Sequence, residues 1–84
     1  SRALFAAAEE VRRGVDQANR VLSTLRRIIL EPHLSIDYVA AVDPATFKPV
    51  ERITGPTLLL AAARVGNTRL IDNLLVEPPN VRSG

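Results

Sequence analysis

The chain has 84 residues and a formal net charge of +2, with 46% hydrophobic and 24% charged residues, a composition typical of one globular domain that excludes two independent cores. It has no cysteine and a single histidine, His33, so neither a disulfide framework nor a Cys/His zinc site can form. The basic residues are spread along the chain with few aromatic residues among them, which argues against nucleic-acid binding, and no apolar run approaches the roughly 18 residues that span a membrane.

The first thirty residues show the pattern of amphipathic helices. Apolar residues recur at alternating steps of four and three and predict one buried stripe, made of Leu4, Ala8, Val11, Val15, Ala18, Leu22, Leu25 and Ile29. Gly14 interrupts this stripe at a cost of about 1 kcal/mol relative to alanine, and Asp16 is suited to cap a new helix, so two helices are predicted. Glu31-Pro32 ends the second helix, because the residue before proline is pushed out of the helical region.

The next segment changes to the two-residue period of a strand. In residues 35–43 two sets of side chains alternate, Ile36, Tyr38, Ala40 and Val42 against Asp37, Val39 and Ala41. The residues from Asp43 to Thr46 predict a type I turn, with aspartate at the first position and Pro44 at the second. A short return strand is expected from Lys48 to Ile53, where Pro49, which lacks a backbone N–H, belongs at a sheet edge.

Residues 57–66 are ambiguous by local pattern. Pro56 and Gly66 suit the start and the end of a helix rich in leucine and alanine, yet a buried strand bounded by turn residues has the same pattern at this length. Gly66-Asn67 is a turn signal, and Arg69–Val76 alternates like a strand that pairs back on its predecessor.

These elements predict a single α+β domain over residues 1–84. Residues 1–31 are expected to be helical, residues 35–76 to form a small and mainly antiparallel β-sheet on which the two helices pack, and residues 77–84 to be a tail.

Three blocks carry a resemblance to a known family. The first is Ile36-Asp37-Tyr38-Val39 with Val42-Asp43-Pro44, the second is residues 59–66 (LLAAARVG), and the third is residues 68–73 (TRLIDN). In this order and spacing they resemble the C-terminal domain of the pantothenate synthetase, or pantoate–beta-alanine ligase, family. The resemblance covers nearly the whole chain and weakens between Gly14 and Leu34. It implies that residues 57–65 form a strand, which outweighs the weak local preference for helix.

The resemblance implies an ATP-dependent ligase that joins pantoate to beta-alanine through a pantoyl adenylate, with ATP and Mg²⁺ required by the full-length enzyme. The family's nucleotide-binding fold and reactive motifs precede the matching segment, so no catalytic residue, cofactor site or metal ligand is assigned to this chain. The implied role is a noncatalytic lid that packs on the N-terminal nucleotide-binding domain of the same enzyme and excludes water from the adenylate. The full-length enzyme is expected to be a cytoplasmic homodimer, and Ser1 in place of an initiating methionine fits a piece of a longer protein.

Arg64, Asn67 and Arg69 are the candidate substrate-binding residues. A hairpin tip with two guanidinium groups can reach an anionic substrate or phosphate when a lid closes. The plainer interpretation is a solvated turn whose arginines pair with Asp72 or Glu77.

Two other candidate sites are weighed and given structural roles. Asp37, Asp43 and Asp72 are considered as a carboxylate cluster for magnesium, but a turn role for Asp43 and an outward strand position for Asp37 are favoured. His33, at the joint between helix and strand, is interpreted as a loop residue without a function.

Two alternatives to a lid are a free-standing protein-interaction module that binds its partner through the helical apolar stripe, and a small basic nucleic-acid binder, which the sequence supports least. Arg12-Arg13 and Arg26-Arg27 are interpreted as the solvent-exposed face of the helices. A lid should expose an apolar patch where another domain docks, whereas a free module should be polar except at one partner groove.

Overall fold

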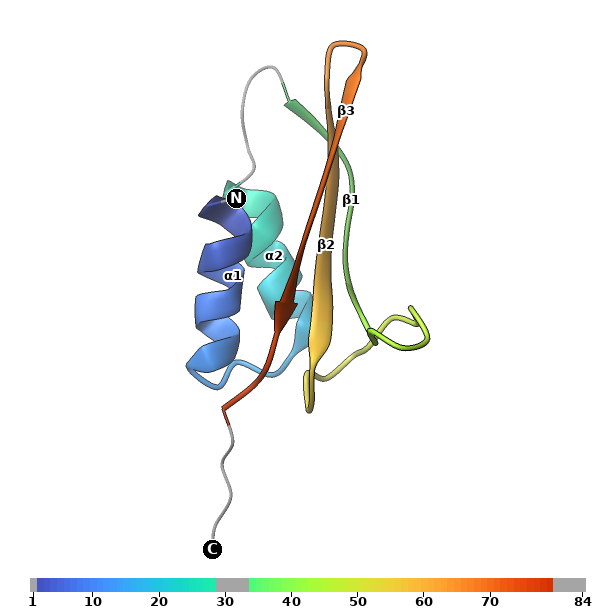
Figure 1. Cartoon of the computed structure of the whole chain (residues 1–84). Coiled ribbons are helices and arrows are strands. Elements are labelled where there is room, and N and C mark those ends of the chain that lie inside the picture. Colours follow the sequence, from blue (N-terminus) through green and yellow to red (C-terminus); the bar gives the residue numbers. More distant parts are fainter. Residues whose placement is uncertain (1, 29–33, 80–84) are drawn as a thin grey trace, which may run out of the picture.

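The computed structural model describes residues 2–28 and 34–79. Five elements follow in chain order: α1 (Arg2–Arg12), α2 (Ala18–Ile28), β1 (Leu34–Val42), β2 (Thr57–Val65) and β3 (Thr68–Val76). The strands form one antiparallel sheet in the order β1-β2-β3, and both helices lie against one face of it (Figure 1). This two-layer α+β arrangement confirms the predicted fold class.

The two helices are separated where the glycine predicted a break. α1 contains four alanines among its 11 residues and ends at Arg12, after which Gly14 takes a φ of 101° that favours glycine. The capping role expected for Asp16 was wrong, because α2 begins at Ala18 and the carboxylate of Asp16 accepts a hydrogen bond of 2.9 Å from Arg52. The side chain of Asp16 is therefore bonded to Arg52, which lies 36 positions away in the sequence, and does not cap α2.

Replacing Gly14 by alanine is expected to lower the free energy of unfolding by about 1–3 kcal/mol, because a φ of 101° is strained for any residue with a Cβ. A Cβ at Gly14 meets no atom within 4 Å, so the cost comes from backbone strain rather than a clash. Gly55→Ala is the matched control, since its Cβ also lies in open space and its φ is outside the strained range. Urea unfolding of both variants measures the difference, and equal losses would contradict the explanation.

The hydrophobic core lies between the helical layer and the sheet. Most of the predicted helical stripe is buried there, with Leu4, Val11 and Leu25 at 1% exposure or less. The sheet contributes apolar side chains from all three strands, which are Val39, Ala41, Leu59 and Val76. Because the stripe packs against the chain's own sheet, it is not available as a binding surface for a partner.

β1 contains an irregularity that the sequence pattern did not predict. The pairing with β2 shifts by one residue between Ile36 and Tyr38, so Asp37 is an extra residue in a β-bulge. The bulge reverses the alternation, so that Ile36 packs against the core together with Val39, whereas Tyr38 points to the opposite face. The expectation that Ile36 and Tyr38 share a face was therefore wrong, because a one-residue insertion moves every side chain beyond it to the other side.

The ambiguous segment, β2, is the central strand, as the family resemblance implied. It pairs along its length with β1 on one side and β3 on the other, and this pairing overrides the helix preference of leucine and alanine. The predicted hairpin is confirmed: Val65 pairs with Thr68, and Gly66, with a φ of 60°, is the first of the two residues between them. Glycine is favoured at this position of a type II′ turn.

The return strand expected from Lys48 to Ile53 is not formed. The turn after β1 does lie where predicted, since Asp43 Oδ1 accepts bonds from the backbone N–H groups of Ala45 (2.8 Å) and Thr46 (3.1 Å). Pairing with β1 is then limited to an isolated bridge between Val42 and Pro49, in which the Val50 N–H donates to the Ala41 carbonyl at 3.0 Å and the Asp43 N–H donates to the Lys48 carbonyl at 2.9 Å. Beyond this bridge, Arg52 pairs with Gln17 in the connection between the helices, so the segment does not continue along β1. The chain instead passes the beginning of α2 before it enters β2 (Figure 1).

The segment after the Val42–Pro49 bridge is hydrogen-bonded to the connection between the two helices. The Ile53 N–H donates to the Asp16 carbonyl at 2.7 Å, the Ala18 N–H donates to the Glu51 carbonyl at 3.0 Å, and the side chain of Ile53 is 1% exposed. Ile53 therefore belongs to the core, although it was expected on an edge strand.

Some predictions fall on residues 1, 29–33 and 80–84, outside the described part of the chain. These are the helix stop at Glu31-Pro32, the loop assignment of His33, the burial of Ile29 and the end of the tail. Within the described residues, no helix is long and apolar enough to cross a membrane.

Candidate functional site

The face of the sheet turned away from the helices carries an apolar surface. By the strand register, three rows of side chains share this face: Tyr38, Ala62 and Ile71; Ala40, Leu60 and Asn73; Val42, Leu58 and Leu75. Tyr38, Ile71 and Leu75 are 41%, 61% and 52% exposed, respectively. We call these three rows the outer face, and most of its members would be expected in a core rather than in water.

At the hairpin end of the outer face, three charged side chains form a cluster. Arg64 and Arg69 are directly opposite each other on β2 and β3, and both contact the carboxylate of Asp37. The Nε atoms of Arg64 and Arg69 lie 3.3 Å and 3.4 Å from the same Oδ2 atom. We call these residues the Asp37 trio, and its formal charge is +1.

The β-bulge makes the Asp37 trio possible. If the alternation of Val39 and Ala41 continued without interruption, Asp37 would point with them towards the helices. As the extra residue of the bulge, Asp37 instead directs its carboxylate to the two arginines. This carboxylate offsets the repulsion that like charges directly opposite each other on neighbouring strands would otherwise cause.

The structure brings together two of the three predicted binding residues. Arg64 and Arg69 meet in the Asp37 trio, while Asn67 lies in the two-residue turn beyond them. Their partnership with Asp37 was missed, because Asp37 is 27 positions from Arg64 and its strand alternation gave no sign of a bulge.

The carboxylates considered as a magnesium site have other surroundings. Asp37 belongs to the trio, Asp43 accepts bonds from its own turn, and Asp72 Oδ1 accepts a 2.9 Å bond from the Asn73 N–H. Among the residues that the structure describes, no group of three His, Cys, Asp or Glu side chains is placed to hold a metal ion.

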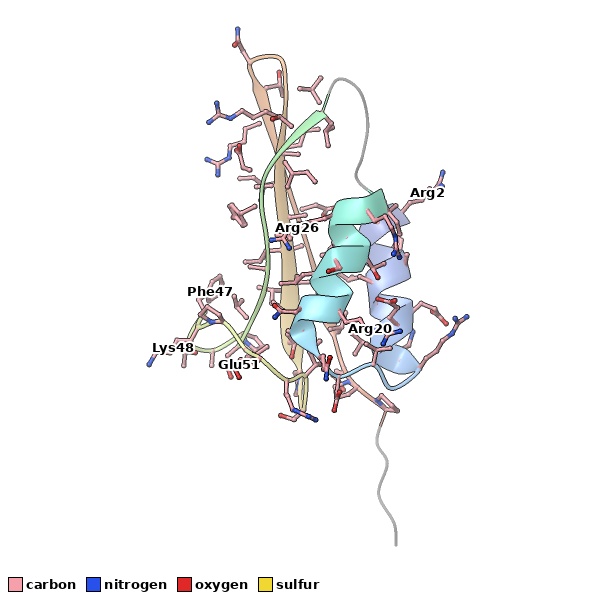
Figure 2. The ribbon with its side chains drawn as sticks, turned by 180° about the vertical axis from the view of Figure 1, so that it is seen from behind. Arg2, Arg20, Arg26, Phe47, Lys48 and Glu51 are labelled. Carbon is pink, nitrogen blue, oxygen red and sulfur yellow. The ribbon has the colours of Figure 1, made fainter. Side chains whose placement is uncertain are left out.

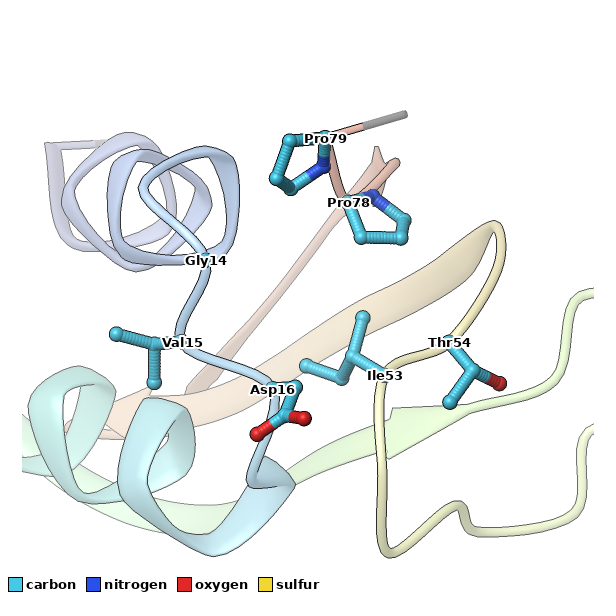
Figure 3. A pocket seen from close by; sticks show the side chains of 7 residues that line it. All are labelled: Gly14, Val15, Asp16, Ile53, Thr54, Pro78 and Pro79. Carbon is cyan, nitrogen blue, oxygen red and sulfur yellow. The ribbon is translucent and has the colours of Figure 1, made fainter. Parts of the chain in front are cut away.

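A small cavity lies at the other end of the molecule, between the helix connection, the loop before β2 and the residues after β3 (Figure 3). Its volume is about 300 Å³, and Gly14, Ile53, Pro78 and Pro79 are among the residues that line it. The charged residue in its wall, Asp16, is already paired with Arg52. This lining does not favour acid–base or anion chemistry.

The basic residues of the helices are exposed and dispersed. Arg12-Arg13 and Arg26-Arg27 face solvent, as predicted. Figure 2 shows Arg2, Arg20 and Arg26 at separate points of the helical layer, with Lys48 and Glu51 in the loop after β1. A dispersed distribution of this kind does not make the continuous basic stripe that a nucleic-acid backbone requires.

Fold and site together define a two-layer α+β domain with a partly exposed apolar sheet face that ends in a pair of guanidinium groups. Residues 1–75 match the family model described as pantoate-beta-alanine ligase. The chain belongs to this family, as the resemblance of its three sequence blocks indicated.

Several relatives carry a matching segment. Pantothenate synthetase of Rhizorhabdus wittichii is 49% identical over 77 residues, which cover 92% of this chain and 27% of that protein. A bifunctional pantoate ligase/cytidylate kinase of Gloeobacter violaceus is 46% identical over 76 residues, or 89% of this chain and 15% of that protein. A crystal structure of pantothenate synthetase from Thermus thermophilus superposes with a TM-score of 0.79 at 32% identity, over 92% of this chain and 28% of that one. The chain thus spans less than a third of the length of these relatives.

Proposed function

We propose that the chain acts as the noncatalytic lid domain of an ATP-dependent ligase that joins pantoate and beta-alanine. In this role the outer face packs on the nucleotide-binding domain of the same enzyme and covers the pantoyl adenylate formed there. Membership of the pantoate-beta-alanine ligase family and the small share of the relatives' length that the chain spans both support the proposal.

The observation that carries the proposal is the apolar outer face, whose large side chains Tyr38, Ile71 and Leu75 are exposed. An apolar patch of this kind on a small domain is typical of a docking surface, and contacts between domains of one chain commonly have this character. The three large exposed side chains Tyr38, Ile71 and Leu75 lie on one side of a rigid sheet, so they can be covered together by a single partner. Covering them also excludes water from whatever lies beneath.

Exclusion of water has a chemical purpose in this reaction. Attack of water on the pantoyl adenylate would release pantoate and AMP, and ATP would be consumed without any pantothenate being made. A closed lid leaves the amine of beta-alanine as the nucleophile that reaches the acyl carbon. ATP, Mg²⁺ and the reacting groups belong in this proposal to the other domain, in a cytoplasmic and homodimeric enzyme.

The alternative of a free interaction module is not favoured by the packing. That hypothesis needs the helical apolar stripe as its binding surface, and Leu4, Val11 and Leu25 of the stripe are buried in the core. The surface that remains open is on the sheet, on the side away from the helices (Figure 1).

A chimeric enzyme tests the lid role. The matching segment of the Rhizorhabdus wittichii synthetase is replaced by this chain, which is 49% identical to it. AMP and pantothenate are measured for the parent enzyme, for the chimera and for a version from which the segment is deleted. We expect the chimera to keep the ratio of AMP to pantothenate near one, and the deletion to form pantothenate at least about tenfold more slowly, since closure of a lid completes many active sites.

Two outcomes would contradict the lid role. One is a deletion variant that makes pantothenate at the parental rate. The other is a folded chimera whose AMP to pantothenate ratio is as high as that of the deletion, because the chain would then be present without excluding water.

A further inference from the structure

We propose that the Asp37 trio is a binding site for a phosphoryl oxyanion, such as a diphosphate or the phosphate chain of a nucleotide, which replaces Asp37 as the partner of Arg64 and Arg69. The inference rests on the proposed function in one respect, because that function is what supplies the anion in the cell. The site itself consists of residues of this chain alone.

The contacts within the trio are long for ion pairs between guanidinium and carboxylate. Charge-assisted hydrogen bonds of this type are about 2.7–2.9 Å long, whereas the two Nε to Oδ2 distances here are 3.3 Å and 3.4 Å. By comparison, Arg12 with Glu9 and Arg52 with Asp16 both reach 2.9 Å. One oxygen shared between two guanidiniums is therefore a weak contact that a better acceptor can displace.

The geometry favours a tetrahedral anion over a carboxylate. The contacts within the trio use the Nε atoms, so the terminal Nη groups of both arginines can engage an added ligand. A carboxylate has two oxygens and saturates one guanidinium in a bidentate pair, whereas a phosphoryl group has three and can bridge two. The side chains of Arg64 and Arg69 are 59% and 50% exposed, which leaves them accessible.

The position of the trio adds to its suitability. It adjoins the row of Tyr38, Ala62 and Ile71 on the outer face, and the β2–β3 hairpin that carries both arginines extends past the helices (Figure 1). If a domain docks on the outer face, the trio lies at the rim of that contact. Water is partly excluded there, and electrostatic attraction is stronger than in bulk solvent.

The backbone holds the two arginines in place. Arg64 and Arg69 are paired residues next to a two-residue turn, so their Cα atoms are fixed by the β2–β3 ladder rather than by a long loop. Binding of an anion that bridges them therefore costs little backbone entropy, although two long side chains must still be ordered.

The test measures binding to the 84-residue chain by NMR, following the side-chain Nε–H signals of its arginines during titration with sodium diphosphate at constant ionic strength. We expect saturable shifts at Arg64 and Arg69. Arg64→Gln and Arg69→Gln should each weaken binding about tenfold or more, the loss typical of a hydrogen bond to a charged group. Arg52→Gln, which removes an exposed arginine from another ion pair, is the matched control and should bind like the parent.

Asp37→Asn separates a ligand site from a purely structural ion-pair cluster. Removing the competing carboxylate should strengthen diphosphate binding by about threefold to tenfold, because a negative charge close to the anion is lost. A cluster that only holds the bulge predicts no gain in affinity. Diphosphate, ATP and acetate are titrated in parallel, and acetate should bind more weakly than the other two.

Each outcome decides the proposal. Uniform shifts at all arginines, binding unchanged in both glutamine variants, or weaker binding after Asp37→Asn would overturn the site. A folded chimera whose AMP to pantothenate ratio is as high as that of the deletion, together with intact diphosphate binding, would refute the lid role and leave the anion site standing. A chimera that keeps the parental ratio while the chain shows no such binding would refute the anion site and leave the lid role standing.

Discussion

Replacing Leu59 by alanine is expected to lower the free energy of unfolding by about 2–5 kcal/mol, the usual cost of truncating a buried leucine. Leu59 is fully buried in the central strand β2, where it faces the helices and pairs with Ala41 on one side and Leu74 on the other. A domain of this size has a stability of roughly 4–13 kcal/mol, so the variant should lose a large part of that stability. Urea unfolding followed by circular dichroism measures the change.

Leu75→Ala is the matched control for this prediction. Leu75 is the same residue type in the same sheet, but it lies on the outer face of β3 and is 52% exposed. Its truncation should cost less than about 1 kcal/mol, as expected for a partly exposed position. Similar losses at both positions would mean that the outer face is covered in the isolated chain, for example by a second copy.

The double substitution Ile71→Gln and Leu75→Gln in the chimeric ligase is expected to reduce pantothenate formation by about tenfold or more. Each change puts an amide into a surface that becomes dehydrated on docking, at a cost of about 1–3 kcal/mol per unpaired polar group. Because both residues are more than half exposed, the fold of the chain itself should persist. Steady-state turnover, with the AMP to pantothenate ratio, measures the effect.

Phe5→Gln provides the control for this substitution. Phe5 is 60% exposed, close to the 61% of Ile71, but it lies on α1 in the helical layer. Its replacement should leave turnover near the parental value. If Phe5→Gln abolished turnover while the double substitution on the sheet had no effect, the helical layer would be the docking surface and the outer face would not.

The family and the general layout were accessible from local features of the sequence. The stripe from Leu4 to Leu25 predicted the helices and most of their buried residues, because burial of one side of a helix imposes its own period. Gly14 and the Gly66-Asn67 pair marked real breaks, since positive φ angles favour glycine wherever they occur. For residues 57–65, the family resemblance was needed to choose a strand over a helix.

The candidate site was only half predictable. Arg64 and Arg69 could be placed together, because a two-residue turn between strands dictates that its flanking residues are neighbours. Asp37 could not be added to them, because its place depends on the register of β1 against β2. In that register both Ile36 and Val39 pack against the core, and these contacts are with residues that are distant from Asp37 in the sequence.

The sequence by itself thus determined the helical stripe, the positions of the breaks and the presence of strands near residues 35–43 and 69–76, which depend on residues close together in the chain. The order and spacing of three sequence blocks determined the family. Only the tertiary structure decided the β-bulge at Asp37, the loss of the strand at Lys48–Ile53 and the pairing of Asp16 with Arg52. It also decided which face of the sheet stays open, because two short helices can cover only one side of three strands (Figure 1). These features depend on contacts between distant residues, whose energies a local pattern does not contain.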